Sequence, residues 1–311
     1  MEVKPPLYSA NIYHLLRRFG MKEYIEAFTV YLQEVRQSSL NTIRAYQNDL
    51  RKLESYLIQQ GIESTSKITE TSLNSYVLSL EKEGLSPSTV SRHIASMKAY
   101  LLFLLKNGSI KGDPSERIKS PKVIKKPPKI LEEDKILALL NMPDVHTSKG
   151  IRDKAMLELL YATGMKVSEL TCVKISDINL TGKYLTCGDK NERSIPFGYA
   201  AKDALVSYID IREALCIKKY NEYLFLNSQG EQLSRQGFWK ILKGYAKEVG
   251  LQDINPNMIR HSFAAHMIEN GADLGVVQKF LGHSDISTTQ LYLTHNHQNS
   301  REVYANSHPR A

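Results

Sequence analysis

Residues 257–292 read NMIRHSFAAHMIENGADLGVVQKFLGHSDISTTQLY, and the rest of the chain is organised around them. Their apolar residues recur at helical spacing and predict two short helices, which end at Gly271 and Gly282. The stretch carries a cation, an imidazole and a phenol in order: Arg260, His283 and Tyr292.

These three side chains have the chemistry needed to attack a phosphodiester. A guanidinium can bind phosphate oxygens, a histidine can donate a hydrogen bond, and a tyrosine hydroxyl can act as nucleophile without a metal. Each fragment alone has an ordinary structural explanation, because an Arg-His pair is usually a solvated helix cap and a Leu-Gly-His is usually a turn. The combination, with Tyr292 nine residues after His283, favours catalysis.

The same stretch resembles the C-terminal signature of the tyrosine recombinases. It contains an Arg-His-Ser-Phe box, a Leu-Gly-His box and a Thr-Thr-Gln-x-Tyr box, and residues 308–311 are similar to the tail of the bacterial Xer branch. The resemblance implies that Tyr292 attacks the scissile phosphate, forms a 3′-phosphotyrosyl link and frees a 5′-hydroxyl that attacks the partner strand. It also implies two duplexes held by four protomers, with no ATP, other cofactor or metal.

Length and composition predict a two-domain protein that binds a polyanion. A chain of 311 residues is long enough to form two domains, each with its own hydrophobic core. The net charge of +8 is compatible with either nucleic acid or a membrane surface as the binding partner, and charge alone does not distinguish them. The sequence has no long apolar run and no N-terminal export signal, so we expect a cytoplasmic protein without a membrane partner. The three cysteines lack the spacing of a zinc site or a disulfide framework.

The N-terminal part predicts a mainly α fold. After an extension at residues 1–21, residues 22–108 contain four amphipathic segments, which predict a four-helix bundle. The Ser-x-x-Thr-x-x-x-Tyr-x-x-Asp-Leu pattern of residues 39–50 and the Ser-Thr-x-x-Arg pattern of residues 88–92 resemble the SAM-like core-binding domain of the recombinases. Basic residues off the apolar faces are individually an ordinary surface, but the resemblance implies that some contact DNA: Arg44, Arg92 and Lys98.

Residues 109–130 are rich in proline and lysine and predict a basic linker. Its prolines and its glycine exclude a long helix, and it contains seven basic residues and two acidic ones. A solubilising linker would have this composition, and so would a hinge that lies along DNA phosphates. We expect DNA contacts from Lys122, Lys125 and Lys126.

Residues 131–292 predict a catalytic domain of mixed helices with one small antiparallel sheet. Two helices and a hairpin of two strands are expected first, at residues 132–140, 152–163, 184–187 and 194–197. Residues 293–311 form a C-terminal tail, which the resemblance implies is a subunit-exchange segment that docks on a neighbouring protomer.

Two family positions hold a different residue here. The family's Gly-x-Arg-x-Ser-Glu-Leu box reads Gly-Met-Lys-Val-Ser-Glu-Leu over residues 164–170, so Lys166 replaces its first arginine, while Arg260 matches the second. Lysine keeps the charge but loses the planar fork that binds two phosphate oxygens. Asn257 stands where the family usually has histidine; it can hydrogen-bond a phosphate but cannot take a proton near neutral pH.

The resemblance suggests further site residues. In the family a lysine at the hairpin tip protonates the leaving oxygen, and here that position indicates Lys190, with Lys183 as the alternative. Glu169 would orient the cation at position 166, although a glutamate in the first turn of a helix is also favourable without any catalytic role. Two residues fall where the family's catalytic domain meets the DNA groove: Arg235 and Gln236.

We therefore expect a site-specific DNA recombinase of the Xer-like kind, which acts on a target of paired half-sites and resolves replicon multimers. A second recombinase or an accessory protein is a further candidate partner. Two other interpretations stay open: an integrase or transposase of a mobile genetic element, and a DNA-binding relative whose turnover is weakened by Lys166 and Asn257. Tyr304 is the other tyrosine downstream of His283 and lies outside the motif.

Overall fold

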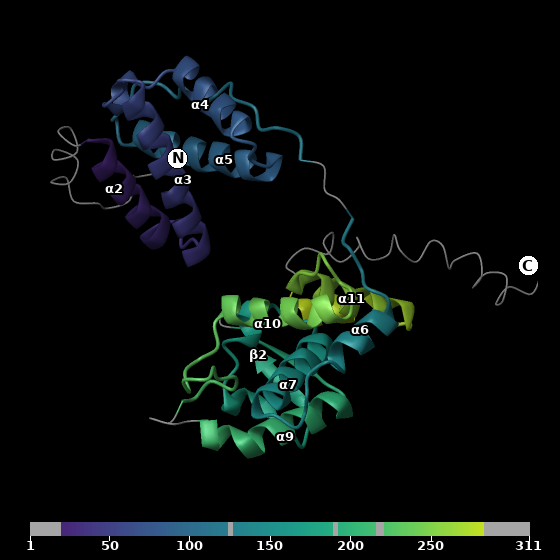
Figure 1. The fold of residues 1–311 in the computed structure, drawn as a ribbon. Helices are drawn as coiled ribbons and strands as arrows, with labels where there is room; N and C mark the ends of the chain where they lie inside the picture. The colour runs from purple at the N-terminus through teal and green to yellow at the C-terminus, as the bar shows by residue number, and fades with distance from the viewer. Residues whose placement is uncertain (1–19, 124–126, 189–191, 216–220, 283–311) are drawn as a thin grey trace, which may run out of the picture. The chain divides into compact units, whose positions relative to one another are not determined.

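The computed structural model describes most of the chain, namely residues 20–123, 127–188, 192–215 and 221–282. The chain divides into two compact units, Met1–Lys125 and Lys126–Ala311 (Figure 1). No helix within the described ranges is long and apolar enough to cross a membrane.

The N-terminal unit contains the four α-helices that the sequence predicts. They are α2 (Met21–Glu34), α3 (Leu40–Gln59), α4 (Glu70–Lys82) and α5 (Pro87–Lys106), with a short 3-10 helix, η2 (Thr65–Lys67), before α4. Three of these helices begin at a hydroxyl side chain that accepts a hydrogen bond from a first-turn backbone N–H: Ser39, Thr69 and Ser86. These three helix starts therefore have a direct physical cause.

The apolar stripes of these helices form one core, which continues beyond α5. The stripes meet inside the bundle because apolar residues repeat every three to four positions. Ile110 and Ile118, from the segment predicted as a linker, are also buried in this core. The start of that segment is thus packed on the N-terminal unit as far as Ile118.

The described part of the C-terminal unit combines seven α-helices with a small antiparallel sheet. The helices are α6 (Glu133–Leu140), α7 (Ser148–Thr163), α8 (Val167–Leu170), α9 (Tyr199–Leu215), α10 (Arg235–Glu248), α11 (Pro256–Glu269) and α12 (Leu274–Leu281), with a 3-10 helix, η3 (Ile175–Asp177), before the sheet. The strands are β1 (Ile178–Asn179), β2 (Tyr184–Cys187) and β3 (Arg193–Pro196), in the order β1-β2-β3. The mainly α fold with one small sheet is confirmed, and β1 is a strand that the sequence did not reveal.

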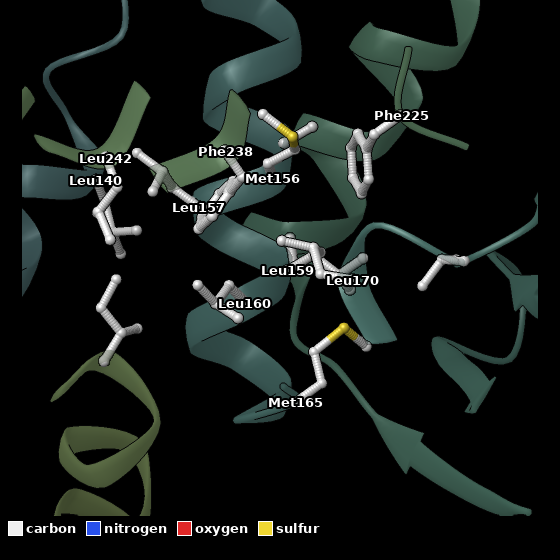
Figure 2. Close-up of a cluster of buried hydrophobic side chains, with 14 of the residues drawn as sticks. Leu140, Met156, Leu157, Leu159, Leu160, Met165, Leu170, Phe225, Phe238 and Leu242 are labelled. Carbon is white, nitrogen blue, oxygen red and sulfur yellow. The ribbon is translucent and has the colours of Figure 1, made fainter. Parts of the chain in front are cut away.

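Helix α7 lies at the centre of the C-terminal core. It is buried on nearly all sides and contacts α9 and α11. Figure 2 shows how its side chains meet those of the surrounding elements; the labelled residues are Leu140, Met156, Leu157, Leu159, Leu160, Met165, Leu170, Phe225, Phe238 and Leu242.

A buried ion pair near the start of α7 joins three parts of this unit. Arg152 donates from Nε (2.9 Å) and Nη2 (2.7 Å) to Oδ1 of Asp153, and from Nη1 to the carbonyl of Leu226 (3.0 Å). Tyr245 on α10 donates to Oδ2 of Asp153 at 2.9 Å. Because a buried carboxylate is tolerated only when it is paired, this network explains the acid in an otherwise apolar stripe.

Candidate active site

Arg260 is anchored between the ends of two other helices. It lies one turn into α11, which begins after the N-cap Asn255, and its side chain is buried. Its Nη1 donates to the carbonyl of Gly164 at 2.9 Å, and its Nη2 donates to the carbonyl of Leu281 at 2.7 Å. The guanidinium plane is therefore fixed by the last residues of α7 and α12.

The serine and phenylalanine of the Arg-His-Ser-Phe box help to hold α11 in place. Ser262 accepts a hydrogen bond from the backbone N–H of Leu131 (2.8 Å) and donates to the carbonyl of Met258 (2.8 Å). Phe263 packs on Gly164, where an added Cβ would come within 2.2 Å of the ring. Gly164 also has φ +58°, which favours glycine, so α7 ends against α11 at this residue.

Lys166 follows Gly164 by two residues and is the N-cap of α8. Its side chain is exposed and makes no hydrogen bond or ion pair with any other described residue. Its backbone N–H donates to Oε2 of Glu169 at 2.7 Å. Arg260 bonds the carbonyl of Gly164, and Lys166 follows Gly164 by two residues. The start of α8, with the cation at position 166, therefore lies in the same part of the C-terminal unit as Arg260.

Glu169 is held by an arginine on strand β3. Arg193 donates from Nη1 to Oε1 (3.0 Å) and from Nη2 to Oε2 (2.9 Å) of this carboxylate. Burial alone would raise the pKa of Glu169, but the hydrogen bonds from Arg193 and from the backbone of Lys166 outweigh it and lower that pKa. Glu169 is thus a carboxylate at neutral pH.

Arg193 also contacts the end of α12. Its Nε donates to the carbonyl of Phe280 at 2.7 Å, and a Cβ added to Gly282 would come within 3.1 Å of its guanidinium. Gly282 has φ +64° and ends α12 directly before His283. Arg193 therefore joins α8, β3 and the segment that leads into the predicted site histidine.

Asn257 is an exposed residue in the first turn of α11, three residues before Arg260. Residues at this spacing share a face of a helix, so its amide lies on the same side of α11 as the guanidinium. An amide in this place can bind a phosphate oxygen but supplies no general base.

The predicted general acid, histidine and nucleophile fall outside the described residues, as do two linker lysines and the rival tyrosine: Lys190, His283, Tyr292, Lys125, Lys126 and Tyr304. The alternative acid, Lys183, is described. It is half-buried, and its Nζ lies 3.6 Å above the centre of the Tyr199 ring.

The remaining predicted DNA contacts lie on the surfaces of both units. Arg44 and Arg92 are exposed on α3 and α5 of the N-terminal unit, and Lys98 on α5 is half-buried. Lys122 is exposed beyond that core. In the C-terminal unit, two exposed residues open α10: Arg235 and Gln236. Exposure is required for a DNA contact, and these residues stay predictions.

Arg193 is the site residue that sequence reasoning missed. A signal for it was present, because Arg193 directly precedes the predicted strand of residues 194–197 and lies two positions before Ile195; once β3 begins at Arg193, it shares a face with this fully buried residue. A cation on the inner face of a strand needs a buried partner, and Glu169 is that partner.

The described residues contain no group of three metal-binding side chains. Cys187 is buried in β2, and burial raises the pKa of its thiol to about 11. It is therefore a neutral thiol and is unreactive at neutral pH.

Comparisons with known proteins identify both units. Residues 25–108 match the family Phage integrase, N-terminal SAM-like domain, and residues 129–299 match the Phage integrase family. A tyrosine recombinase XerD from Listeria monocytogenes serotype 4b is 42% identical over 298 residues, which covers 94% of this chain and 100% of that protein. A tyrosine recombinase XerC from Roseiflexus castenholzii is 41% identical and covers 94% of this chain and 95% of that protein.

A solved structure shares the fold. A XerH site-specific recombinase, bound to a palindromic difH substrate in a post-cleavage complex, has a TM-score of 0.70 at 22% identity and covers 93% of this chain and 85% of that chain. The family matches and the relatives at 41–42% identity show that the chain belongs to the tyrosine recombinases of the phage integrase family, and that it is a Xer-like site-specific recombinase, an enzyme that acts on DNA.

Proposed function

We propose that this recombinase cuts and rejoins DNA through a 3′-phosphotyrosyl link at Tyr292, within a site built around Arg260. The observation that carries the proposal is the pair of hydrogen bonds that fixes Arg260 between Gly164 and Leu281. Lys166 follows the first of these carbonyls by two residues, and His283 follows the second by two residues. One buried guanidinium thus links the segments that carry the other proposed groups.

In this proposal the cations act on the charge that develops at the phosphate. Attack by Tyr292 adds negative charge to the non-bridging oxygens, and Arg260, Lys166, His283 and the Asn257 amide stabilise it. A preorganised cation contributes more than a mobile one, because it needs no reorientation during attack. Glu169 and Arg193 hold the start of α8 and therefore position Lys166.

The leaving 5′ oxygen needs a proton, and Lys190 is the proposed donor. In the sequence it falls between the end of β2 and the start of β3, and Arg193 follows it by three residues. The link from Arg193 to Glu169 therefore ties that hairpin to α8. Lys183 is the less suitable donor, because its ammonium already lies against the Tyr199 ring.

We also propose that four protomers hold two duplexes with paired half-sites, with DNA contacts from both units and from the basic segment at Lys122, Lys125 and Lys126. Relatives named XerD and XerC cover nearly the whole chain, which supports a role in resolving replicon multimers over a role in a mobile element. The tail after residue 292 is the proposed contact between neighbouring protomers.

A recombination assay tests this function. The purified protein first selects its duplex from a random library, and the selected site is then placed twice in one circular plasmid. We expect deletion between the two copies without ATP or added metal, and an intermediate with a free 5′-hydroxyl and a 3′ end blocked by protein. Joining of dissimilar DNA ends would instead favour a mobile-element role. Tight binding without any covalent product would contradict the proposed chemistry.

A further inference from the structure

A buried acid lies directly beneath a surface arginine in the N-terminal unit. Asp49 on α3 is only 3% exposed, and its Oδ1 lies 3.1 Å from Nη2 of Arg92 on α5. The side chain of Arg92 is 42% exposed. One end of this ion pair is therefore inside the bundle and the other end reaches solvent.

Side chains from two helices hold Asp49 in place. His93 Nε2 lies 3.3 Å from Oδ1, and the Ser96 hydroxyl donates to Oδ2 at 3.4 Å; both residues are on α5. Tyr76 on α4 places its hydroxyl 2.9 Å from Nδ1 of His93 and donates to the backbone carbonyl of Asp49 at 3.4 Å. Asp49, on α3, is therefore held by side chains from α4 and α5.

The charges in this cluster make Arg92 the partner of Asp49. Burial lowers the pKa of His93 to about 4, so His93 is neutral at neutral pH. Burial raises the pKa of Asp49, and the largest opposing effect is the charge of Arg92. A buried carboxylate without a cation would be costly, so the guanidinium of Arg92 balances this charge.

A second arginine in the same unit has no such support. Arg44 is exposed on α3, five residues before Asp49, and its side chain makes no hydrogen bond or ion pair with any other described residue. Of two arginines that are proposed to contact DNA, Arg92 has a fixed partner within the bundle and Arg44 has none among the described residues.

We propose that Asp49 is a positioning residue for DNA recognition, which holds the guanidinium of Arg92 in the orientation that meets a phosphate of the recombination site. The inference rests on the proposed DNA contact of Arg92. A side chain that is ordered before binding loses less freedom when the complex forms, and phosphate contacts fix the register of a protein on its duplex. Asp49 thereby favours the one register in which the phosphate meets Arg92.

The negative charge of Asp49 has an opposite effect on DNA in general. It partly cancels the attraction of Arg92 for any phosphate, so removing the charge strengthens or preserves binding to random duplex. Asp49→Asn should therefore lower the ratio of specific to non-specific affinity by roughly threefold to tenfold, the range expected for one ordered side chain.

A double-mutant cycle tests the inference on the full-length protein. The affinities for the selected duplex and for a random duplex are measured at one salt concentration for wild type, Asp49→Asn, Arg92→Gln and the double variant. We expect Asp49→Asn to lower the ratio in wild type and to leave it unchanged when Arg92 is already replaced. The inference would be overturned if Asp49→Asn lowered the affinity ratio equally in both backgrounds, or if it raised the ratio in the wild-type background. If Arg92→Gln alone leaves both affinities unchanged, the proposed DNA contact of Arg92 is wrong and the inference fails with it.

Two further variants separate orientation from folding. Arg92→Lys keeps the charge, changes no buried residue and removes the planar fork, so it should lower the ratio even if Asp49→Asn unfolds the unit. An unchanged ratio in Arg92→Lys would contradict the need for a fixed guanidinium. The matched control is Glu63→Gln, which removes one exposed negative charge from the same unit and should leave the ratio as in wild type.

Discussion

Arg193 on strand β3 and Glu169 on helix α8 form a two-pronged ion pair, with Nη1 3.0 Å from Oε1 and Nη2 2.9 Å from Oε2. The same guanidinium donates from Nε to the carbonyl of Phe280 at 2.7 Å. One side chain thus holds the start of α8, the hairpin and the end of α12 together. Its geometry matters more than its charge, because only a planar fork makes these bonds at once.

The first prediction is that Arg193→Lys slows cleavage without weakening DNA binding. A shift of about 1 Å in proposed site groups can cost on the order of a hundredfold in rate. Single-turnover cleavage and equilibrium binding are compared on one duplex. Lys174→Ala, which breaks the exposed ion pair with Glu222 in the same unit, should change neither quantity. A parallel loss of affinity would show that Arg193 supports folding or docking instead.

The second prediction concerns Lys166, which stands where the family has arginine. Lysine offers phosphate a point charge, whereas arginine holds two oxygens in a plane. Lys166→Arg should speed formation of the covalent adduct by up to about a hundred- to thousandfold, while the dissociation constant changes little. Equal rates for the two proteins would show that the site is adapted to lysine. A large change in affinity would mean that residue 166 serves docking more than catalysis.

The helices could be predicted from sequence because their causes are local. Helix α5, for example, starts at Ser86-Pro87 and carries one apolar stripe, and the structure has both features. The catalytic boxes were recognisable for the same reason, because Arg260, His283 and Tyr292 lie in one continuous stretch.

Other features depend on contacts between distant residues. Strand β1 has two residues, which is too short for an alternating pattern. Arg193 and Glu169 are separated by 24 positions, and no local pattern pairs them. Ile110 and Ile118 lie among basic residues and prolines, and only the tertiary structure shows that they belong to the N-terminal core. Composition therefore predicted that residues 109–130 are basic, but it did not predict that the start of this segment packs on the N-terminal core.

The third prediction is that the basic segment contributes to the salt dependence of DNA binding. Replacing Lys122, Lys125 and Lys126 by glutamine should weaken binding to all sequences and reduce the slope of log affinity against log salt by up to about three phosphate contacts. A comparison variant neutralises three exposed lysines outside the proposed interface, Lys67, Lys82 and Lys135, and should change the slope less. An unchanged slope in the first variant would remove the segment from the interface.

The fourth prediction is that acidification destabilises the N-terminal unit through His93. Burial is the main cause that lowers the pKa of this imidazole to about 4; the charges of Arg92 and Lys52 act in the same direction, and Glu83 acts against them. Between about pH 6.5 and about pH 4, His93 is protonated in the unfolded chain but neutral in the folded unit. The free energy of unfolding therefore falls as pH drops from about 6.5 towards 4. The loss should be on the order of 2 kcal/mol near pH 5. The raised pKa of Asp49 acts in the opposite sense, because the folded state then takes up a proton.

Hydrogen exchange measures this pH dependence in α3 and α5 of the full-length protein, after correction for the intrinsic exchange rate at each pH. His93→Gln should flatten the profile, and His146→Gln, at an exposed position in the other unit, should keep it. A wild-type profile that is flat between neutral pH and about pH 5 would contradict the role of His93.

The last prediction is that Tyr292 is the nucleophile, and mapping the covalent bond tests the account most directly. A nicked duplex, from which the cleaved fragment diffuses away, traps the protein on DNA, and mass spectrometry of the digested adduct identifies the modified tyrosine. We expect the DNA on the peptide that contains Tyr292, no adduct with Tyr292→Phe, and a normal adduct with the matched variant Tyr304→Phe. An adduct that persists in Tyr292→Phe and disappears in Tyr304→Phe would contradict the account.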